Sequence, residues 1–227
     1  MRDLIDTTEM YLKTIYELEE DSIVPMRARI VERLGHTGPT VSQTIARMER
    51  DGLVVVESDR RLSLTEEGAE LATEVMRKHR LAERLLVDVI GLDWARAHDE
   101  ACRWEHVMSD CVEERLMKIL ECSKKDPYGN PIPGESEHVE GQVPLSQLRD
   151  KIKDGEALNV ELVRIGEAVQ TDERFLTSLS DIKMRPSDEI SVTSEGGVLR
   201  ITHASESAKS RGFVEIPGWA EPHIFVS

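Results

Sequence analysis

The sequence predicts a mainly α-helical protein with small β parts, built from three successive units. Two patterns carry this prediction. The first half of the chain holds runs with apolar residues at helical spacing, broken by Gly and Pro. From residue 143 onward, short alternating apolar runs typical of strands replace them. We therefore expect a winged helix-turn-helix over residues 1–73, a helical domain with a Pro-containing linker over 74–140, and an SH3-like β-barrel over 141–227.

Composition excludes several classes of protein. No apolar run approaches the roughly 20 residues of a membrane helix, and the start, MRDLIDTTEM, lacks a secretory signal. The three cysteines, Cys102, Cys111 and Cys122, are few and odd in number, so we expect reduced thiols in the cytoplasm. A net charge of −15 opposes general attraction to DNA or anionic membranes. Any DNA binding therefore needs a local basic face, and no membrane partner is expected.

The first unit contains three expected helices. Residues 4–20 carry apolar residues near helical period, with Asp6 or a neighbouring threonine as cap. A short helix follows Pro25 and ends before 35–38, and Thr37 caps a third helix that runs to residue 50. With its apolar side chains facing inward, the third helix leaves polar residues for the outside: Thr40, Ser42, Gln43, Arg47 and Arg50.

A β-hairpin is expected directly after these helices. Residues 53–56 and 62–64 are β runs that flank a basic tip at 58–61, which is typical of the wing of a winged helix. The alternative is a small α+β core without DNA binding. The types of the outward-facing residues favour the DNA-binding interpretation, because such side chains contact phosphates and base edges in protein–DNA complexes. The basic face would comprise Arg27, Arg29, Arg33, Arg47, Arg50, Arg60 and Arg61.

The middle of the chain predicts further amphipathic helices. Thr65 resembles the start of a capping box, and the helix that follows runs apolar to Gly91. Further helices are expected from Trp94 to about His106 and over 111–120. These helices leave apolar surface that a winged helix alone cannot cover, so dimerisation is expected, and a two-fold dimer matches palindromic half-sites. Residues 126–134 begin a linker.

Ligand-type side chains gather on these helices. Cys102, Glu105 and His106 stand at i, i+3 and i+4, so they share one helix face, and His98 lies one turn back. Upstream, His79 and Glu83 form a second i, i+4 pair. Thiol, carboxylate and imidazole groups on a helix face are the ligand set of a transition-metal site. Any one of the histidines, taken alone, is more often an ordinary surface or core residue.

The last unit predicts short strands. Residues 158–165, 189–193, 198–202 and 223–226 alternate in polarity, and Gly196-Gly197 indicates a hairpin. Residues 171–179 are expected to form one short helix. Several short strands within about 80 residues favour a small SH3-like barrel.

Several segments together resemble the iron-dependent regulator family, that of the diphtheria toxin repressor. They are DTTEMYL at 6–12, GPTVSQ at 38–43, RMERDGL at 47–53, MRKHRLAERLL at 76–86, HDEACRWEHVMS at 98–109 and GNPIPG at 129–134. The resemblance is dense over residues 1–134 and looser beyond. It implies an iron(II)-activated, DNA-binding transcriptional repressor of iron-homeostasis genes, not an enzyme, with a helical metal-binding and dimerisation domain.

The resemblance also implies two metal sites per subunit, which cobalt, nickel, zinc or manganese can occupy in place of iron. The first maps onto Met10, Cys102, Glu105 and His106, with the Cys102 carbonyl as a further ligand. The second maps onto His79, Glu83 and His98, completed by Gln170 and Glu173 from the barrel. The family commonly has Glu followed three residues later by Gln, so Gln170 and Glu173 stand in reversed order; the alternative is that both are solvated. Metal binding would order the N-terminal helix and stabilise the DNA-competent dimer.

The implied partner is a double-stranded palindromic operator bound by a homodimer, with two dimers per operator as a further option. Gln43 and Pro39 are expected at base edges or thymine methyls, with Ser42 as a weaker candidate. Phosphate contacts are expected from Thr7, Arg27, Thr37, Thr40, Arg47, Arg50 and Arg60.

Three alternatives remain open at this point. A manganese-responsive regulator would have the same architecture, although the Cys102 thiol favours iron over manganese. A metallohydrolase could use the same cluster, but the sequence offers it no separate general base. A DNA-binding structural protein with vestigial metal ligands would bind DNA equally well in a chelator.

Overall fold

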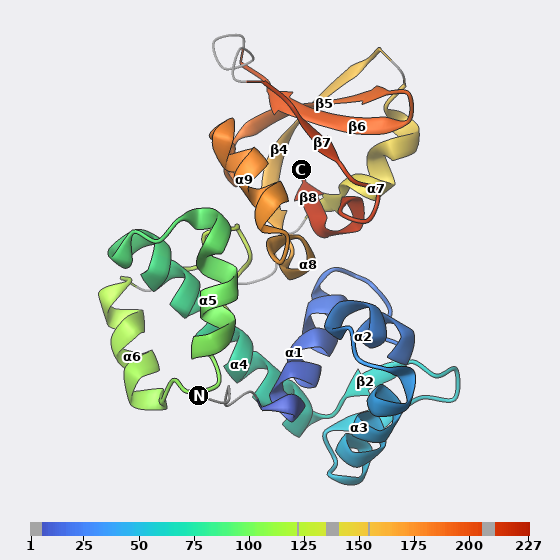
Figure 1. Cartoon of the computed structure of the whole chain (residues 1–227), viewed down its shortest axis with the longest axis vertical. Coiled ribbons are helices and arrows are strands. Elements are labelled where there is room, and N and C mark those ends of the chain that lie inside the picture. Colours follow the sequence, from blue (N-terminus) through green and yellow to red (C-terminus); the bar gives the residue numbers. More distant parts are fainter. Residues whose placement is uncertain (1–5, 122, 135–140, 154, 206–211) are drawn as a thin grey trace.

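The three predicted units are present in the structure, a computed structural model that describes residues 6–121, 123–134, 141–153, 155–205 and 212–227. Figure 1 shows the winged helix at the lower right, the helical unit at the lower left and the sheet unit at the top. None of the described helices combines the length and apolar character needed to cross a bilayer. The predicted boundary after residue 140 falls at the edge of 135–140, which lie outside the described residues.

The winged helix consists of α1 (Thr7–Glu20), α2 (Arg27–Leu34), α3 (Gly38–Arg50) and a hairpin of β1 (Val54–Val56) and β2 (Leu62–Leu64). Its caps are those that the sequence predicts: the Asp6 side chain accepts from Thr8 and Glu9 amides, and Thr37 accepts from the Thr40 amide. Apolar faces of the three helices and the hairpin close one core. Its centre is formed by Leu12, Ile15, Ile30, Val41, Ile45, Met48 and Leu62.

A long helix, α4 (Glu66–Arg84), connects this unit to the next and continues as a π-helical turn, η1 (Leu85–Ile90). The predicted boundary at 73/74 therefore lies inside one helix. Gly68 lies where α4 crosses the backbone of Leu53, and a Cβ there would be 2.0 Å from the Leu53 carbonyl oxygen. The second unit adds a 3-10 turn, η2 (Trp94–Arg96), α5 (Ala97–Trp104) and α6 (Asp110–Ile119).

The last unit is built on a six-stranded antiparallel sheet in the order β3-β8-β4-β5-β6-β7. The strands are β3 (Val143–Pro144), β4 (Ala157–Ile165), β5 (Glu189–Glu195), β6 (Val198–His203), β7 (Val214–Ile216) and β8 (Ile224–Val226). Gly196 and Gly197 form the expected hairpin turn between β5 and β6, both at positive φ. Helices α7 (Leu145–Leu148), α8 (Glu167–Gln170) and α9 (Glu173–Asp181), with the 3-10 turns η3 (Arg149–Lys151) and η4 (Glu221–His223), complete it.

The short helix expected over 171–179 is present as α9, which begins two residues later because Asp172 caps it by accepting from the Phe175 amide. The sequence did not predict α8, which directly precedes it. The segment expected to begin a linker at 126–134 is non-helical, as predicted, and its residues 126–133 are buried. Asp126 holds that segment by accepting hydrogen bonds from the Tyr128 and Asn130 amides, at 2.7 and 2.9 Å.

Candidate metal centre and DNA-binding surface

Four candidate ligands from three helices meet in a fully buried cluster. His79 and Glu83 lie one turn apart on α4, His98 lies on α5, and Glu167 begins α8. One ligand atom from each lies within 4.8 Å of the others. His79 Nε2 is 2.8 Å from Glu83 Oε1 and 3.3 Å from Glu167 Oε2, and His98 Nδ1 is 3.2 Å from Glu167 Oε2. Two imidazoles and two carboxylates at this spacing form a metal-ligand set.

Three buried oxygens in this region test whether the residues fit a metal. Glu83 Oε2 and Gln170 Oε1 make no hydrogen bond to the described residues, while Glu167 Oε2 faces the His79 and His98 rings, and all three side chains are buried. The Gln170 amide nitrogen is used, donating to the Ile165 carbonyl at 2.8 Å. A buried oxygen without a donor is costly unless a cation faces it. These residues therefore fit an oxygen- and nitrogen-binding divalent cation.

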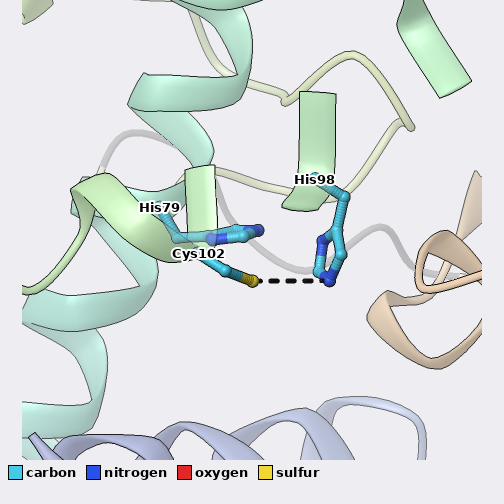
Figure 2. A group of neighbouring side chains, drawn as sticks. All are labelled: His79, His98 and Cys102. Carbon is cyan, nitrogen blue, oxygen red and sulfur yellow. Dashed lines mark hydrogen bonds between the residues drawn. The ribbon is translucent and has the colours of Figure 1, made fainter. Parts of the chain in front are cut away.

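The other predicted ligand group, that of Met10, Cys102, Glu105 and His106, lies beside this cluster. Figure 2 shows the Cys102 thiol pointing toward His98, with His79 alongside, and the Cys102 Sγ to His98 Nε2 distance is 3.6 Å. Glu105 Oε1 lies 3.3 Å from His106 Nε2. Met10 lies on α1 and lines a cavity of about 680 Å³, whose walls also include Cys102, Glu105 and His106. The structure thus brings all four predicted residues of this group to one cavity.

The two groups form one contiguous centre. Glu105 Oε2 lies 2.5 Å from His79 Nδ1, so a residue assigned to one group contacts a residue assigned to the other. Between them lies Lys13, whose Nζ is 2.8 Å from Glu105 Oε2 and 3.0 Å from His79 Nδ1. Sequence analysis missed Lys13, although its spacing of i+3 from Met10 places it on the same face of α1.

The buried charged groups of this centre shift one another's pKa values. Burial alone would raise the pKa of Cys102, but the positive charges on His98 and Lys13 outweigh it and lower the pKa to about 6. Burial likewise opposes charge on Glu105, yet Lys13 and His79 lower its pKa to about 2. The carboxylates in turn hold the pKa of His79 well above its ordinary value, against burial and Lys13. At neutral pH the thiol and carboxyl groups are therefore in their ligating, anionic forms.

The two ligands predicted from the barrel, Gln170 and Glu173, lie in different surroundings. Gln170 is buried at the end of α8, one turn after Glu167. Glu173 does not join the cluster: its side chain is exposed and lies 3.7 Å from Arg96 at the surface. The Glu that reaches the cluster is Glu167, which sequence analysis missed. The order Glu167-Ala-Val-Gln170 is the Glu-then-Gln pattern that the resemblance implies, and it would have identified this residue.

Arg80 joins the three units beneath the cluster. Its guanidinium is fully buried, donates to both Glu20 carboxylate oxygens at 2.9 and 2.5 Å, and donates to Glu167 Oε1 at 3.2 Å. It also donates to the Pro131 carbonyl at 2.6 Å. Because α1, α4, the 126–133 segment and α8 all meet at one charged group, Glu167 is held in a fixed orientation.

The sheet unit is also connected to the end of α1. Asp21, the C-cap of α1, has one carboxylate oxygen 2.8 Å from Arg164 Nη1 and the other 2.6 Å from His223 Nδ1. Arg164 also donates to the Glu20 carbonyl at 3.0 Å and stacks 3.4 Å from the Phe225 ring centroid. The strand that leads into α8 therefore contacts the first helix of the winged helix.

The predicted DNA-contact residues lie mainly on one exposed surface of α3 and its cap. Thr37 and Thr40 hydroxyls are 2.8 Å apart at the start of α3. One predicted contact differs: Arg27 is half-buried, and its Nε makes no hydrogen bond to the described residues. Those that are exposed are Thr7, Thr37, Pro39, Thr40, Ser42, Gln43, Arg47, Arg50 and Arg60.

Arg60 at the tip of the wing has an unusual backbone. Its φ is +71°, in the left-handed region that a non-glycine residue seldom occupies. The turn is held by hydrogen bonds from the Arg60 amide to the Glu57 carbonyl and from the Arg61 amide to Asp59.

Family models match most of the helical part of the chain. Residues 3–62 match the N-terminal DNA-binding domain of the iron-dependent repressors, and residues 65–134 match their metal-binding and dimerisation domain. The chain is 54% identical over 207 residues to the diphtheria toxin repressor of Corynebacterium diphtheriae, covering 89% of this chain and 91% of that protein. It is 52% identical over 207 residues to the iron-dependent repressor IdeR of Mycobacterium tuberculosis, covering 88% and 90%.

Solved structures share the whole fold. A manganese-dependent transcriptional repressor in complex with manganese superposes with a TM-score of 0.79 at 26% identity, covering 97% of this chain and 99% of that one. The IdeR of T. acidophilum superposes with a TM-score of 0.75 at 26% identity, covering 98% of each chain. The likeness thus extends through the sheet unit, which neither family model covers.

Proposed function

This chain belongs to the iron-dependent repressor family and is a DNA-binding transcriptional repressor, and from that premise we propose how iron(II) activates it. The observation that carries the proposal is the buried centre, which joins residues of the helical and sheet units and borders a cavity that Met10 of the winged helix lines. Two of its buried oxygens, Glu83 Oε2 and Gln170 Oε1, make no hydrogen bond to the described residues. Such a centre gives a cation a way to fix the units relative to one another. The metallohydrolase alternative is set aside, since the family consists of repressors.

We propose two ligand groups within this centre. His79, Glu83, His98, Glu167 and Gln170 would hold one ion, with Glu167 replacing Glu173 of the sequence prediction. The other group is Met10, Cys102, Glu105 and His106, which share a cavity. The first group is rich in oxygen and nitrogen, whereas the second adds two sulfur ligands.

The group formed by Met10, Cys102, Glu105 and His106 connects metal binding to DNA binding. These residues would hold iron(II), which would supply a cation that joins α1 to the end of α5. Met10 lies on α1, whose apolar face is part of the winged-helix core, so fixing Met10 against Cys102 fixes the position of that unit. His106 already contacts the same end of α1, with its Nδ1 2.6 Å from Glu9 Oε2. We infer that metal binding favours one placement of α3 on DNA.

Iron is favoured over manganese as the activating metal. Thioether and thiolate ligands suit iron(II), zinc and the softer ions better than manganese, which prefers oxygen and nitrogen. The relatives that are more than half identical are named for iron or for the diphtheria toxin repressor, whereas the manganese-dependent structure is 26% identical. Cobalt, nickel, zinc and manganese should bind the same ligands, and a manganese-responsive regulator remains the alternative.

The partner of the dimerisation domain is proposed to be a second copy of this chain. The helical unit exposes large apolar side chains on η1, on α6 and after α5, and exposed apolar patches of this kind mark interfaces. The residues are Val89, Ile90, Val107, Val112 and Ile119, each between 49% and 62% exposed. A two-fold dimer presents two α3 helices and so favours palindromic operator DNA in the cytoplasm, bound by one or two dimers.

Selection from random DNA tests the function. Duplexes recovered on the full chain with iron(II) under anaerobic conditions should converge on a palindromic sequence. The same selection in a chelator should yield no convergence. A sequence that emerges equally well in the chelator would support the vestigial-ligand alternative instead.

Gln43 and Arg47 should differ in what they contribute to the selected DNA. Gln43→Ala should relax discrimination at one base position by about 1–3 kcal/mol, because a side-chain amide reads a base edge. Arg47→Ala should weaken binding to all sequences and reduce the salt dependence, because a guanidinium contacts phosphates. Fluorescence anisotropy with selected and scrambled duplexes at two salt concentrations separates the two. Identical behaviour would show that this assignment of contacts is wrong.

A further inference from the structure

Lys13 contacts ligands of both groups although it cannot itself be a ligand while charged. Its Nζ is 2.8 Å from Glu105 Oε2, 3.0 Å from His79 Nδ1 and 3.7 Å from Cys102 Sγ. Only 7% of the Lys13 side chain is exposed. The ammonium therefore lies beside three residues that the proposed function assigns to metal, although His79 faces Glu83 and Glu167 with its other ring nitrogen.

The surroundings explain why a cation lies there. Glu83, Glu105 and Glu167 are buried carboxylates within this centre, and buried anions are strongly unfavourable without a cationic partner. A fixed lysine charge offsets part of that cost in the protein without metal. Once a divalent ion binds Glu105 and Cys102, the ammonium faces like-charge repulsion and loses Glu105 as its acceptor.

Room exists for Lys13 to move away. Its side chain lines the cavity of about 680 Å³, which extends past Thr14 and Glu17, further along the same face of α1. The four-carbon stem of lysine is flexible enough to redirect the ammonium into that space. Lys13 can therefore move away from the ligands by a change of its side-chain conformation alone, and α1 can stay in place.

We propose that Lys13 is a tethered cation that occupies the centre in the absence of metal and must leave Glu105 and His79 when metal binds. This inference rests on the proposed function, because it concerns the same ligands. In this proposal, Lys13 helps to set the metal concentration at which the protein responds. A tethered competitor weakens metal binding while stabilising the metal-free fold.

Two neutral variants test this directly. Lys13→Leu and Lys13→Gln should each bind cobalt(II) about tenfold or more tightly than wild type, because a unit charge close to the ion is removed. Both should lower the unfolding temperature of the metal-free protein, so that the stabilisation by cobalt(II) grows. Affinity is measured by competition with a chelating dye, and unfolding by circular dichroism. Lys13→Arg, which keeps the charge, should not bind more tightly.

Lys78→Leu is the matched control. Lys78 is also a buried lysine, on α4 next to His79, but it pairs with Glu74 and with Asp110, the latter at 3.0 Å. Its removal should destabilise the fold and leave cobalt(II) affinity within about twofold of wild type. Equal or weaker cobalt(II) binding by the neutral Lys13 variants, with wild type binding normally, would overturn the inference alone. Absence of cobalt(II) binding by wild type would overturn the proposed function and this inference with it.

A measurement on the wild-type chain removes any dependence on how well the variants fold. Acetic anhydride modifies accessible amines, and mass spectrometry locates the modified lysines. Lys13 should react slowly without metal, since it is buried and paired, and faster when cobalt(II) is present. Equal reactivity in both states would show that Lys13 does not move.

Discussion

Replacing Cys102 with alanine should abolish metal-activated DNA binding while leaving the fold intact. Cys102 is the proposed sulfur ligand of α5, and its lowered pKa of about 6 makes the thiolate available at neutral pH. Losing partners that merely orient ligands costs about 10- to 100-fold in metal affinity, so loss of a ligand should cost about 100-fold or more. Cobalt(II) titration and anisotropy with the selected duplex measure both effects.

Cys111→Ala provides the control for this change. Cys111 is exposed on α6 and lies outside the metal centre, so the same substitution should leave metal and DNA binding unchanged. Cys102→Ala with full iron(II) activation would refute the proposed coupling. Activation lost in both variants would indicate damage to α6 or to the dimer rather than to the metal centre.

Glu167→Gln should weaken metal binding at one of the two ligand groups by about tenfold or more. The substitution keeps the size of the side chain but removes the negative charge that faces His79 and His98, and charged ligands bind divalent ions far better than amides. The second group should be affected little, because Glu167 is not among its members. Titration with cobalt(II) should therefore show one weakened equivalent and one near wild type.

Glu173→Gln makes the same chemical change six residues away. Its exposed pairing with Arg96 is worth about 1 kcal/mol at most, so metal binding and stability should stay close to wild type. Weakened metal binding in the Glu173 variant, with a normal Glu167 variant, would restore the ligand assignment made from sequence. The pair of variants thus decides between Glu167 and Glu173.

Much of the fold followed from local sequence patterns. Asp6, Thr37 and Thr65 cap the helices that they were expected to cap, because an N-cap interaction involves residues only two or three positions apart. The wing and the Gly196-Gly197 turn were likewise readable from short-range turn chemistry. Helix α8 was missed because residues 166–170 follow an apolar strand and are too few to show a helical period.

The ligand centre was only partly predictable for a different reason. His79, Glu83, His98 and Cys102 stand at helical spacing, so their grouping can be read from the chain. Glu167 and Lys13 reach the same atoms from other units, and their positions depend on how α1 and α8 pack on α4. Charged residues are mostly exposed, so a buried lysine between ligands is not expected from sequence. Contacts between units required the structure.

The affinity of the wild-type chain for its selected duplex, measured anaerobically with and without iron(II), tests the central claim most directly. If Met10 and the ligands of α5 are joined by the metal, iron(II) should raise the DNA affinity by about tenfold or more, as expected for a coupling free energy of about 1–3 kcal/mol. Chelation should reverse the gain. Equal affinity with iron(II) and with chelator would contradict metal activation, whatever the occupancy of the centre.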